Sequence, residues 1–201
     1  MTVIGVTGPS GAGKGAASEI LNEKYGFPVI DADKVYHTLV SAPSDCLEEI
    51  KAYYGESVID SNGALDRRAL GKLVLGEENR EKLELLNKIT HKYVVSEILQ
   101  QLSSLKERNS VCVIDAPLLI EADLCRECNF TVSVIADKGL RAERIAKRDG
   151  ISIDAALKRI NSQKCDEFYI KNTDYTLENN SSVDDLASAV CKILSERRVF
   201  S

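Results

Sequence analysis

The 201-residue sequence has no long apolar run, no basic stretch at its start and no excess of positive charge. The first absence excludes a membrane span, which needs about 18 consecutive apolar residues. Because of the second absence we expect no signal peptide. The net charge of −5 argues against a general nucleic-acid binder. With 44% hydrophobic residues the chain can still bury a core. We therefore expect a cytoplasmic globular protein, a monomer or weak homo-oligomer, without nucleic-acid or membrane partners.

A complete set of zinc ligands is also missing. Cys125 and Cys128 have the spacing of half a zinc site or of a redox pair. The sequence has no second pair of this kind, and His37 and His91 lie too far apart to supply one. We therefore interpret the six cysteines as free structural or incidental thiols.

Short apolar runs alternate with helical patterns along the chain. We expect strands at residues 2–7, 27–30, 111–114, 130–136 and 175–177. Residues 44–105 have an almost entirely helical pattern, interrupted by a turn at Asn62-Gly63. This order predicts an α/β fold with a parallel sheet covered on both faces and a helical insertion that no linker separates. Ligands in such folds bind at the carboxyl ends of the strands, just after Thr7, Ile30 and Ile114.

The segment Gly8–Gly15, GPSGAGKG, follows the first expected strand and opens a helix. It nearly matches the phosphate-binding P-loop pattern in its expected context. Glycines let successive N–H groups point at phosphate oxygens, and Lys14 adds a mobile charge for the β- and γ-phosphates. The alternative is a tight turn with an exposed lysine.

The loop departs from the pattern at the residue after the lysine. A Ser or Thr hydroxyl normally ligates Mg²⁺ there, whereas this chain has Gly15, followed by Ala16. Ser18 is a full turn away and is not expected to replace that hydroxyl. The loop resembles those of cytidylate and adenylate kinases, in which glycine also follows the lysine. We expect phosphates, waters and an acidic residue elsewhere to hold Mg²⁺.

Three aspartates follow expected strands. A kinase needs a carboxylate to accept the proton of the attacking hydroxyl, and Asp33 is the candidate base, with Asp31 in support. The alternative is that one of the two caps the following helix. Asp115 has the position of a metal-facing aspartate, acting directly or through water. It could instead only start a turn.

Arg141, Arg144 and Arg148 share one helix face by their spacing. Such a face can close over a nucleotide and neutralise charge in the transition state, although many basic stripes are only solvated surface. Arg67 and Arg68 are candidates for binding a phosphate of the acceptor. His91 lies mid-helix, where a packed or surface histidine is common.

Taken together, these motifs resemble the dephospho-CoA kinase family nearly from end to end. The matching segments are VTGPSGAGKG (6–15), VIDADKVYH (29–37), GALDRRALGKLVL (63–75), THKYV (90–94), VIDAPLLIE (113–121), LRAERIAKRDGISIDAALKRINSQ (140–163) and TDYTLENNSSVDDL (173–186). The resemblance implies a three-layer P-loop kinase fold in one domain, with an acceptor-binding helical insertion at about 34–107 and a small lid at about 138–165. It also implies ATP-dependent phosphorylation of the ribose 3′-hydroxyl of dephospho-CoA, with Mg²⁺.

The resemblance also assigns roles to matching positions. The implied catalytic residues are Asp33, Lys14 and Arg141. The implied ATP-binding residues are Gly8, Gly11, Ala12, Gly13, Lys14, Gly15, Ala16, Arg144, Arg148 and Asn179, the last near the adenine. The implied acceptor-binding residues are Asp31, Arg67, His91, Leu118, Leu119 and Glu121.

Two alternatives stay open at this point. A nucleoside monophosphate kinase of the cytidylate type would share the GPSGAGKG loop but not the sequence after Leu140. The replacement of the family's usual Ser-Thr by Gly15-Ala16 would also fit a protein that binds nucleotide without catalysis.

Overall fold

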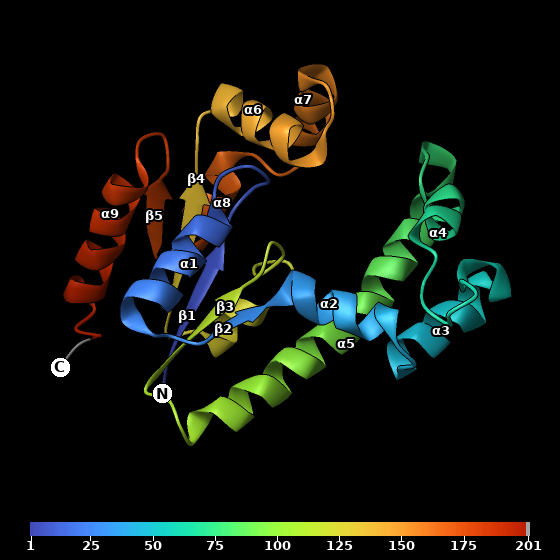
Figure 1. The fold of residues 1–201 in the computed structure, drawn as a ribbon, viewed down its shortest axis with the longest axis horizontal. Helices are drawn as coiled ribbons and strands as arrows, with labels where there is room; N and C mark the ends of the chain where they lie inside the picture. The colour runs from blue at the N-terminus through green and yellow to red at the C-terminus, as the bar shows by residue number, and fades with distance from the viewer. Residues whose placement is uncertain (200–201) are drawn as a thin grey trace. The chain divides into compact units, whose positions relative to one another are not determined.

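The computed structural model describes residues 1–199, which fall into two compact units. The first unit contains Met1–Ile30 and the chain from Ser104 onward, and the second is Asp31–Ser103. Figure 1 shows the fold coloured along the chain.

A five-stranded sheet organises the first unit, with the strand order β2-β3-β1-β4-β5. The strands are β1 (Thr2–Thr7), β2 (Val29–Asp31), β3 (Val111–Asp115), β4 (Phe130–Ile135) and β5 (Tyr175–Glu178). β1 pairs in parallel with β3 and β4, and β4 pairs in parallel with β5. The expected α/β class is confirmed. The second strand begins two residues later than expected, because Phe27 joins the core and stacks on Tyr25 instead of extending the strand.

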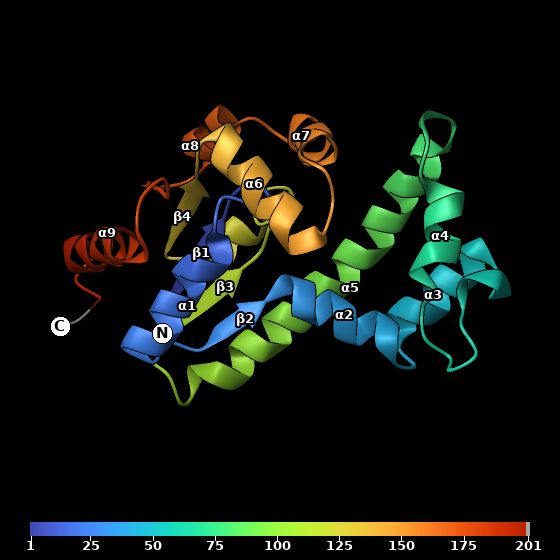
Figure 2. The same cartoon turned by 45° about the horizontal axis from the view of Figure 1, so that its top comes forward.

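Helices follow the strands in the order expected for a parallel sheet. They are α1 (Lys14–Tyr25), the short 3₁₀ helix η3 (Leu124–Glu127), α6 (Lys138–Asp149), α7 (Ile153–Asn161), α8 (Asp166–Asn172) and α9 (Val183–Glu196). α1 ends at Gly26 in the left-handed conformation, so the expected stop is confirmed. α6 and α7 pack on each other through a small apolar cluster that includes Ile145 and Ile160 (Figure 2).

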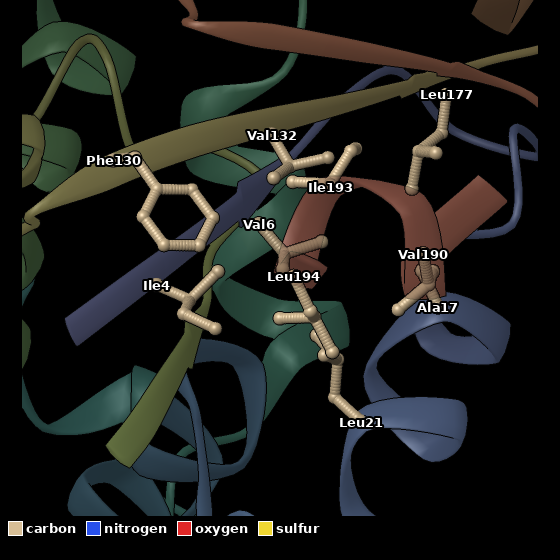
Figure 3. Close-up of a pocket in the computed structure, with 10 residues that line it drawn as sticks. All are labelled: Ile4, Val6, Ala17, Leu21, Phe130, Val132, Leu177, Val190, Ile193 and Leu194. Carbon is tan, nitrogen blue, oxygen red and sulfur yellow. The ribbon is translucent and has the colours of Figure 1, made fainter. Parts of the chain in front are cut away.

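The main core lies between one face of the sheet and helices α1 and α9. Figure 3 shows side chains from β1, β4 and β5 meeting those of the two helices around a small cavity. Its lining is Ile4, Val6, Ala17, Leu21, Phe130, Val132, Leu177, Val190, Ile193 and Leu194. All ten side chains are apolar, so this gap belongs to the packed core and offers no group to orient a ligand.

The opposite face of β1 approaches its neighbours too closely for a side chain at position 5. A Cβ at Gly5 would lie 2.7 Å from both Cys128 Sγ and Leu119 Cδ2. Residues alternate between the faces of a strand, so Ile4 and Val6 enter the core while Gly5 faces the segment that carries η3. This segment thus covers the second face of the sheet beside β1.

The second unit is mainly helical and has its own core. Its elements are α2 (Ala32–Ser41), α3 (Asp45–Tyr54), the 3₁₀ helices η1 (Glu56–Val58) and η2 (Glu77–Asn79), α4 (Arg67–Val74) and most of α5 (Arg80–Lys106). Leu47, Ile50, Leu70 and Ile89 lie in its apolar cluster. The expected turn at residues 62–63 is present, and a single antiparallel bridge, Ile59 to Leu65, flanks it. Among residues 1–199, no helix is long and apolar enough to cross a membrane.

Replacing Leu194 by alanine should test the packing of α9 against the sheet. The Leu194 side chain is buried in the main core, so its truncation should lower the free energy of unfolding by about 2–5 kcal/mol. Chemical denaturation measures the change. As a control, Val183→Ala on the exposed side of the same helix should change it by less than about 0.5 kcal/mol. Equal effects of the two substitutions would contradict the packing described.

Candidate active site

The glycine loop has a backbone that only glycine accommodates at three positions. Gly8, Gly11 and Gly13 have φ angles of 138°, 77° and 101°. A Cβ at Gly8 would lie 2.1 Å from the carbonyl oxygen of Val134, and one at Gly11 would lie 2.7 Å from that of Arg141. The loop is therefore in close contact with the end of β4 and with α6. Its conformation requires these glycines on both torsional and steric grounds.

Arg141 and Arg144 hold the loop through its carbonyl oxygens. Arg141 Nε donates to the Ser10 carbonyl at 3.0 Å, and Arg144 Nη1 donates to those of Gly11 and Ala12 at 3.3 and 3.4 Å. In a trans peptide the C=O and the following N–H point in opposite directions. The N–H groups of Gly11 and Gly13 therefore point away from the two arginines.

Asn179 supports the same loop from the segment after β5. Its buried side-chain amide donates to the Ala12 carbonyl at 2.9 Å, and its own carbonyl accepts from Arg144 Nη2 at 3.0 Å. A Cβ at Gly13 would lie 2.0 Å from Asn179 Nδ2. Asn179 therefore binds the loop backbone directly, and its predicted place beside an adenine stays a prediction.

The Arg141 guanidinium is almost fully buried, with 4% of the residue exposed. Burial lowers its pKa, and the neighbouring Asp166 opposes this effect. Asp166 accepts from Arg141 Nη1 at 3.0 Å. Gln163 Oε1 accepts from the Ser10 N–H at 3.1 Å and from Arg141 Nη2 at 3.4 Å. These partners fix Arg141 against the loop.

Arg148 contacts a different group. It donates to the Asp149 carboxylate at 2.7 and 3.1 Å, and Arg159 on α7 binds the same carboxylate. The hydrogen bonds from Arg148, followed by that from Arg159, lower the pKa of Asp149 to about 2. The structure thus brings Arg141 and Arg144 to the loop, while the contact predicted between Arg148 and a nucleotide stays a prediction.

Lys14 is the first residue of α1, directly after the loop. The N-terminal amides of a helix and its dipole attract anions, so the lysine, the amides and the dipole all favour phosphate at this position. A Cβ at Gly15 would meet no atom within 4 Å. A side chain with a hydroxyl would therefore fit at position 15, and its absence has no steric cause.

Asp115 ends β3 at the same edge of the sheet, where its carboxylate meets α1. Ser18 Oγ donates to Asp115 Oδ2 at 2.8 Å. This bond joins the helix that begins with Lys14 to the strand beside β1. The position predicted for a metal-facing carboxylate is therefore directly anchored to the helix that follows the glycine loop.

The loop after β3 contains three of the residues that were predicted to bind the acceptor. Leu118 is 43% exposed and Glu121 is also exposed, whereas Leu119 is fully buried. The side chain of Leu119 therefore packs inside the protein. Of the three residues, only Leu118 and Glu121 expose their side chains.

The remaining predicted residues lie in the second unit. Asp31 Oδ1 accepts from the N–H groups of Asp33 and Lys34 at 3.0 Å each, so Asp31 is the N-cap of α2, as the capping alternative proposed. Asp33 is exposed in the first turn of that helix. Arg67 begins α4 and its guanidinium lies 5.7 Å from the centre of the Tyr36 ring. His91 lies on α5.

Cys125 and Cys128 on and beside η3 are free thiols. Burial raises the pKa of Cys128 to about 12, which disfavours the reactive thiolate. Across residues 1–199 no cluster of three or more His, Cys, Asp or Glu side chains is arranged to hold a metal ion.

The sequence did not single out Gln163 or Asp166, both of which fix Arg141. Gln163 lies at the end of a segment that carried the family resemblance, which is the only signal that pointed to it. No local pattern marked Asp166, because its partner lies 25 residues away on another helix.

Comparisons with known proteins show the family and the fold of this chain. The dephospho-CoA kinase family model matches residues 2–185. A dephospho-CoA kinase from Fusobacterium nucleatum is 39% identical over 188 residues, covering 94% of each chain. The crystal structure of TT1252 from Thermus thermophilus covers 97% of each chain, with a TM-score of 0.79 and 32% identity. Dephospho-CoA kinase from Campylobacter jejuni covers 97% of this chain and 96% of its own, with a TM-score of 0.70 and 28% identity.

The substitution Gly13→Ala should test the loop. The positive φ and the contact with Asn179 leave no place for the methyl group, so the loop must shift. We expect the affinity for ADP, measured by titration calorimetry, to fall about tenfold or more. Gly15→Ala is the matched control, because its methyl group meets no atom within 4 Å, and it should bind ADP nearly as well as the unchanged protein. Normal ADP binding by Gly13→Ala would contradict the role of the loop.

Proposed function

The chain belongs to the dephospho-CoA kinase family, and we propose that it transfers the γ-phosphoryl group of ATP to the ribose 3′-hydroxyl of dephospho-CoA, giving CoA and ADP. The observation that carries the proposal is the glycine loop before Lys14. Its carbonyl oxygens accept hydrogen bonds from Arg141, Arg144 and Asn179. The match of the family model to residues 2–185 supports the choice of acceptor. This reaction is the last step of coenzyme A synthesis, which we place in the cytoplasm.

The ATP phosphates would lie against the amides of residues 11–16, with Lys14 beside the β- and γ-phosphates. Arg141 was predicted to be catalytic. Because its guanidinium is buried and bonded to Ser10, Gln163 and Asp166, we assign it to positioning the loop instead. Arg144 shares this role through its contacts with Gly11 and Ala12.

The residues around the loop fit a magnesium ion that is held largely by phosphates and water. Mg²⁺ keeps several waters and takes one or two carboxylates, and Asp115 provides an oxygen donor of this kind. When bound, the ion neutralises charge on the β- and γ-phosphates. Residues 15 and 16 offer no hydroxyl, so Asp115 is the protein group that we assign to the ion.

Proton transfer is the task that we assign to Asp33. Its exposed carboxylate accepts the proton of the 3′-hydroxyl as that oxygen bonds to the γ-phosphorus. The bond from the γ-phosphorus to the bridging oxygen breaks, and ADP leaves with that electron pair. Asp31 fixes the backbone at Asp33 by accepting its N–H, so the capping role and the supporting role are compatible.

We assign binding of the acceptor to residues that the sequence analysis predicted in each of the two units. Arg67 would bind an acceptor phosphate, and Asp31 and His91 complete the group from the second unit. In the first unit we assign Leu118 and Glu121 of the loop after β3 to the acceptor, whereas the buried Leu119 supports that loop from inside. We propose that residues 138–165, which include α6 and α7, form the lid, and that Arg148 meets ATP there. The bonds of Arg141 and Arg144 to the loop keep the first part of α6 in place.

The choice of acceptor separates this function from its alternatives. In an assay coupled to ADP release, dephospho-CoA should support turnover at saturating Mg²⁺, whereas cytidine monophosphate should support little. Turnover with cytidine monophosphate alone would instead indicate a nucleoside monophosphate kinase. ADP binding without turnover of either acceptor would indicate a protein that has lost catalysis.

The substitution Asp33→Asn should remove the base. The amide cannot accept the proton, so we expect kcat to fall by a factor on the order of 10²–10⁴ while ADP affinity stays nearly unchanged. The control is Asp45→Asn, which changes an aspartate in the first turn of the neighbouring helix α3 and should leave kcat unchanged. A normal kcat in Asp33→Asn would exclude this residue as the base.

A further inference from the structure

Ser18 is a buried polar residue that the mechanism above does not use. It lies on α1 one turn after Lys14, with 5% of the residue exposed. Its hydroxyl donates to Asp115 Oδ2 at 2.8 Å. A buried hydroxyl bonded to a carboxylate is costly to lose, because the carboxylate would be left without that donor.

The hydrogen bond between Ser18 and Asp115 matters because position 15 is a glycine. In P-loop enzymes a hydroxyl directly after the lysine and an aspartate at a strand end both serve the metal ion. This chain has no hydroxyl at position 15 or 16, so only the aspartate remains. Positions 15 and 18 are three residues apart on α1 and therefore neighbours on the helix surface.

We propose that Ser18 is a positioning residue, which orients the Asp115 carboxylate toward the metal ion of the bound nucleotide and so compensates for the missing hydroxyl at position 15. The inference rests on the proposed function, because it assumes a metal-bound nucleotide at the loop. Ser18 itself need not touch the ion, in agreement with its position a full turn beyond the usual ligand.

The physical basis is the rotation of the carboxylate. The terminal torsion of an aspartate is broad, so each partner of the Asp115 carboxylate narrows the range of its orientations. The hydrogen bond from the buried Ser18 hydroxyl restrains Oδ2 and so limits the direction of the other oxygen. Partners that orient a metal ligand typically change metal affinity or activity 10–100-fold when they are lost. The effect should be large here, because Asp115 is the single protein group that we assign to the ion.

The test measures metal binding separately from turnover. The affinity of the enzyme–ADP complex for Mn²⁺ is determined by electron paramagnetic resonance, and ADP affinity is determined by calorimetry in EDTA. Ser18→Ala should lower Mn²⁺ affinity about tenfold or more while ADP affinity in EDTA stays unchanged. Ser18→Cys keeps the shape of the side chain and replaces the hydroxyl with a somewhat larger thiol that is a weak donor, so it should show the same loss if Ser18→Ala does not fold.

Ser133→Ala is the matched control for buried serines. Its hydroxyl bonds the carbonyl of Tyr175 and the hydroxyl of Thr176, not the Asp115 carboxylate. We expect this variant to lower the melting temperature and to leave Mn²⁺ affinity unchanged. A structural role for Ser18 would give the same pattern in Ser18→Ala, and that result would overturn the proposal.

A second hydroxyl should restore what Ser18→Ala loses. A side chain at position 15 has space, so Gly15→Ser should fold normally. Combined with Ser18→Ala, it should recover much of the Mn²⁺ affinity. No recovery in a folded double variant would contradict the idea that Ser18 compensates for Gly15.

These outcomes separate the inference from the proposed function. If Ser18→Ala and Ser18→Cys bind Mn²⁺ normally while the unchanged protein phosphorylates dephospho-CoA, the inference fails and the function stands. If the unchanged protein binds Mn²⁺ and ADP but does not phosphorylate dephospho-CoA, the function fails, and the variants still decide the role of Ser18.

Discussion

The carbonyl oxygens of residues 10–12 are held by two guanidinium groups and one amide, and the geometry of the site depends on these hydrogen bonds. They fix peptide planes that would otherwise be free to rotate at glycines. Arg141, Arg144 and Asn179 come from two segments after β4, so a loop near the start of the chain is shaped by residues more than 120 positions later. The proposed phosphate site therefore depends on contacts between distant segments of the first unit.

Much of this arrangement could be predicted from the sequence. The apolar runs of β1, β3 and β4 could be recognised because buried parallel strands are almost continuously apolar. The loop could be recognised because its glycines and lysine have a fixed spacing between a strand and a helix. Local pattern could not decide between a cap and a base at Asp31 and Asp33, since both roles favour a carboxylate at the start of a helix. The structure shows that Asp31 is the cap.

The contacts between distant elements could not be predicted. Helical spacing placed three arginines on one face, but it could not show that Arg148 pairs with Asp149 while Arg141 is buried against Asp166. The partner of each arginine depends on which helices pack together, and this packing cannot be inferred from a single sequence. The partner of Ser18 could not be predicted for the same reason, because Asp115 lies on β3, 97 residues later in the chain. The departure at Gly15 was visible from the sequence, but the group that we propose as its compensation was not.

A crystal structure with Mg²⁺ and ADP bound tests the central claim most directly. The account predicts that the β-phosphate lies within hydrogen-bonding distance of backbone N–H groups of residues 11–15 and of Lys14 Nζ. It also predicts that Arg141, Arg144 and Asn179 keep their bonds to the loop carbonyls. Nucleotide bound elsewhere with the glycine loop empty, or a loop that releases these three side chains to reach the phosphates, would contradict it.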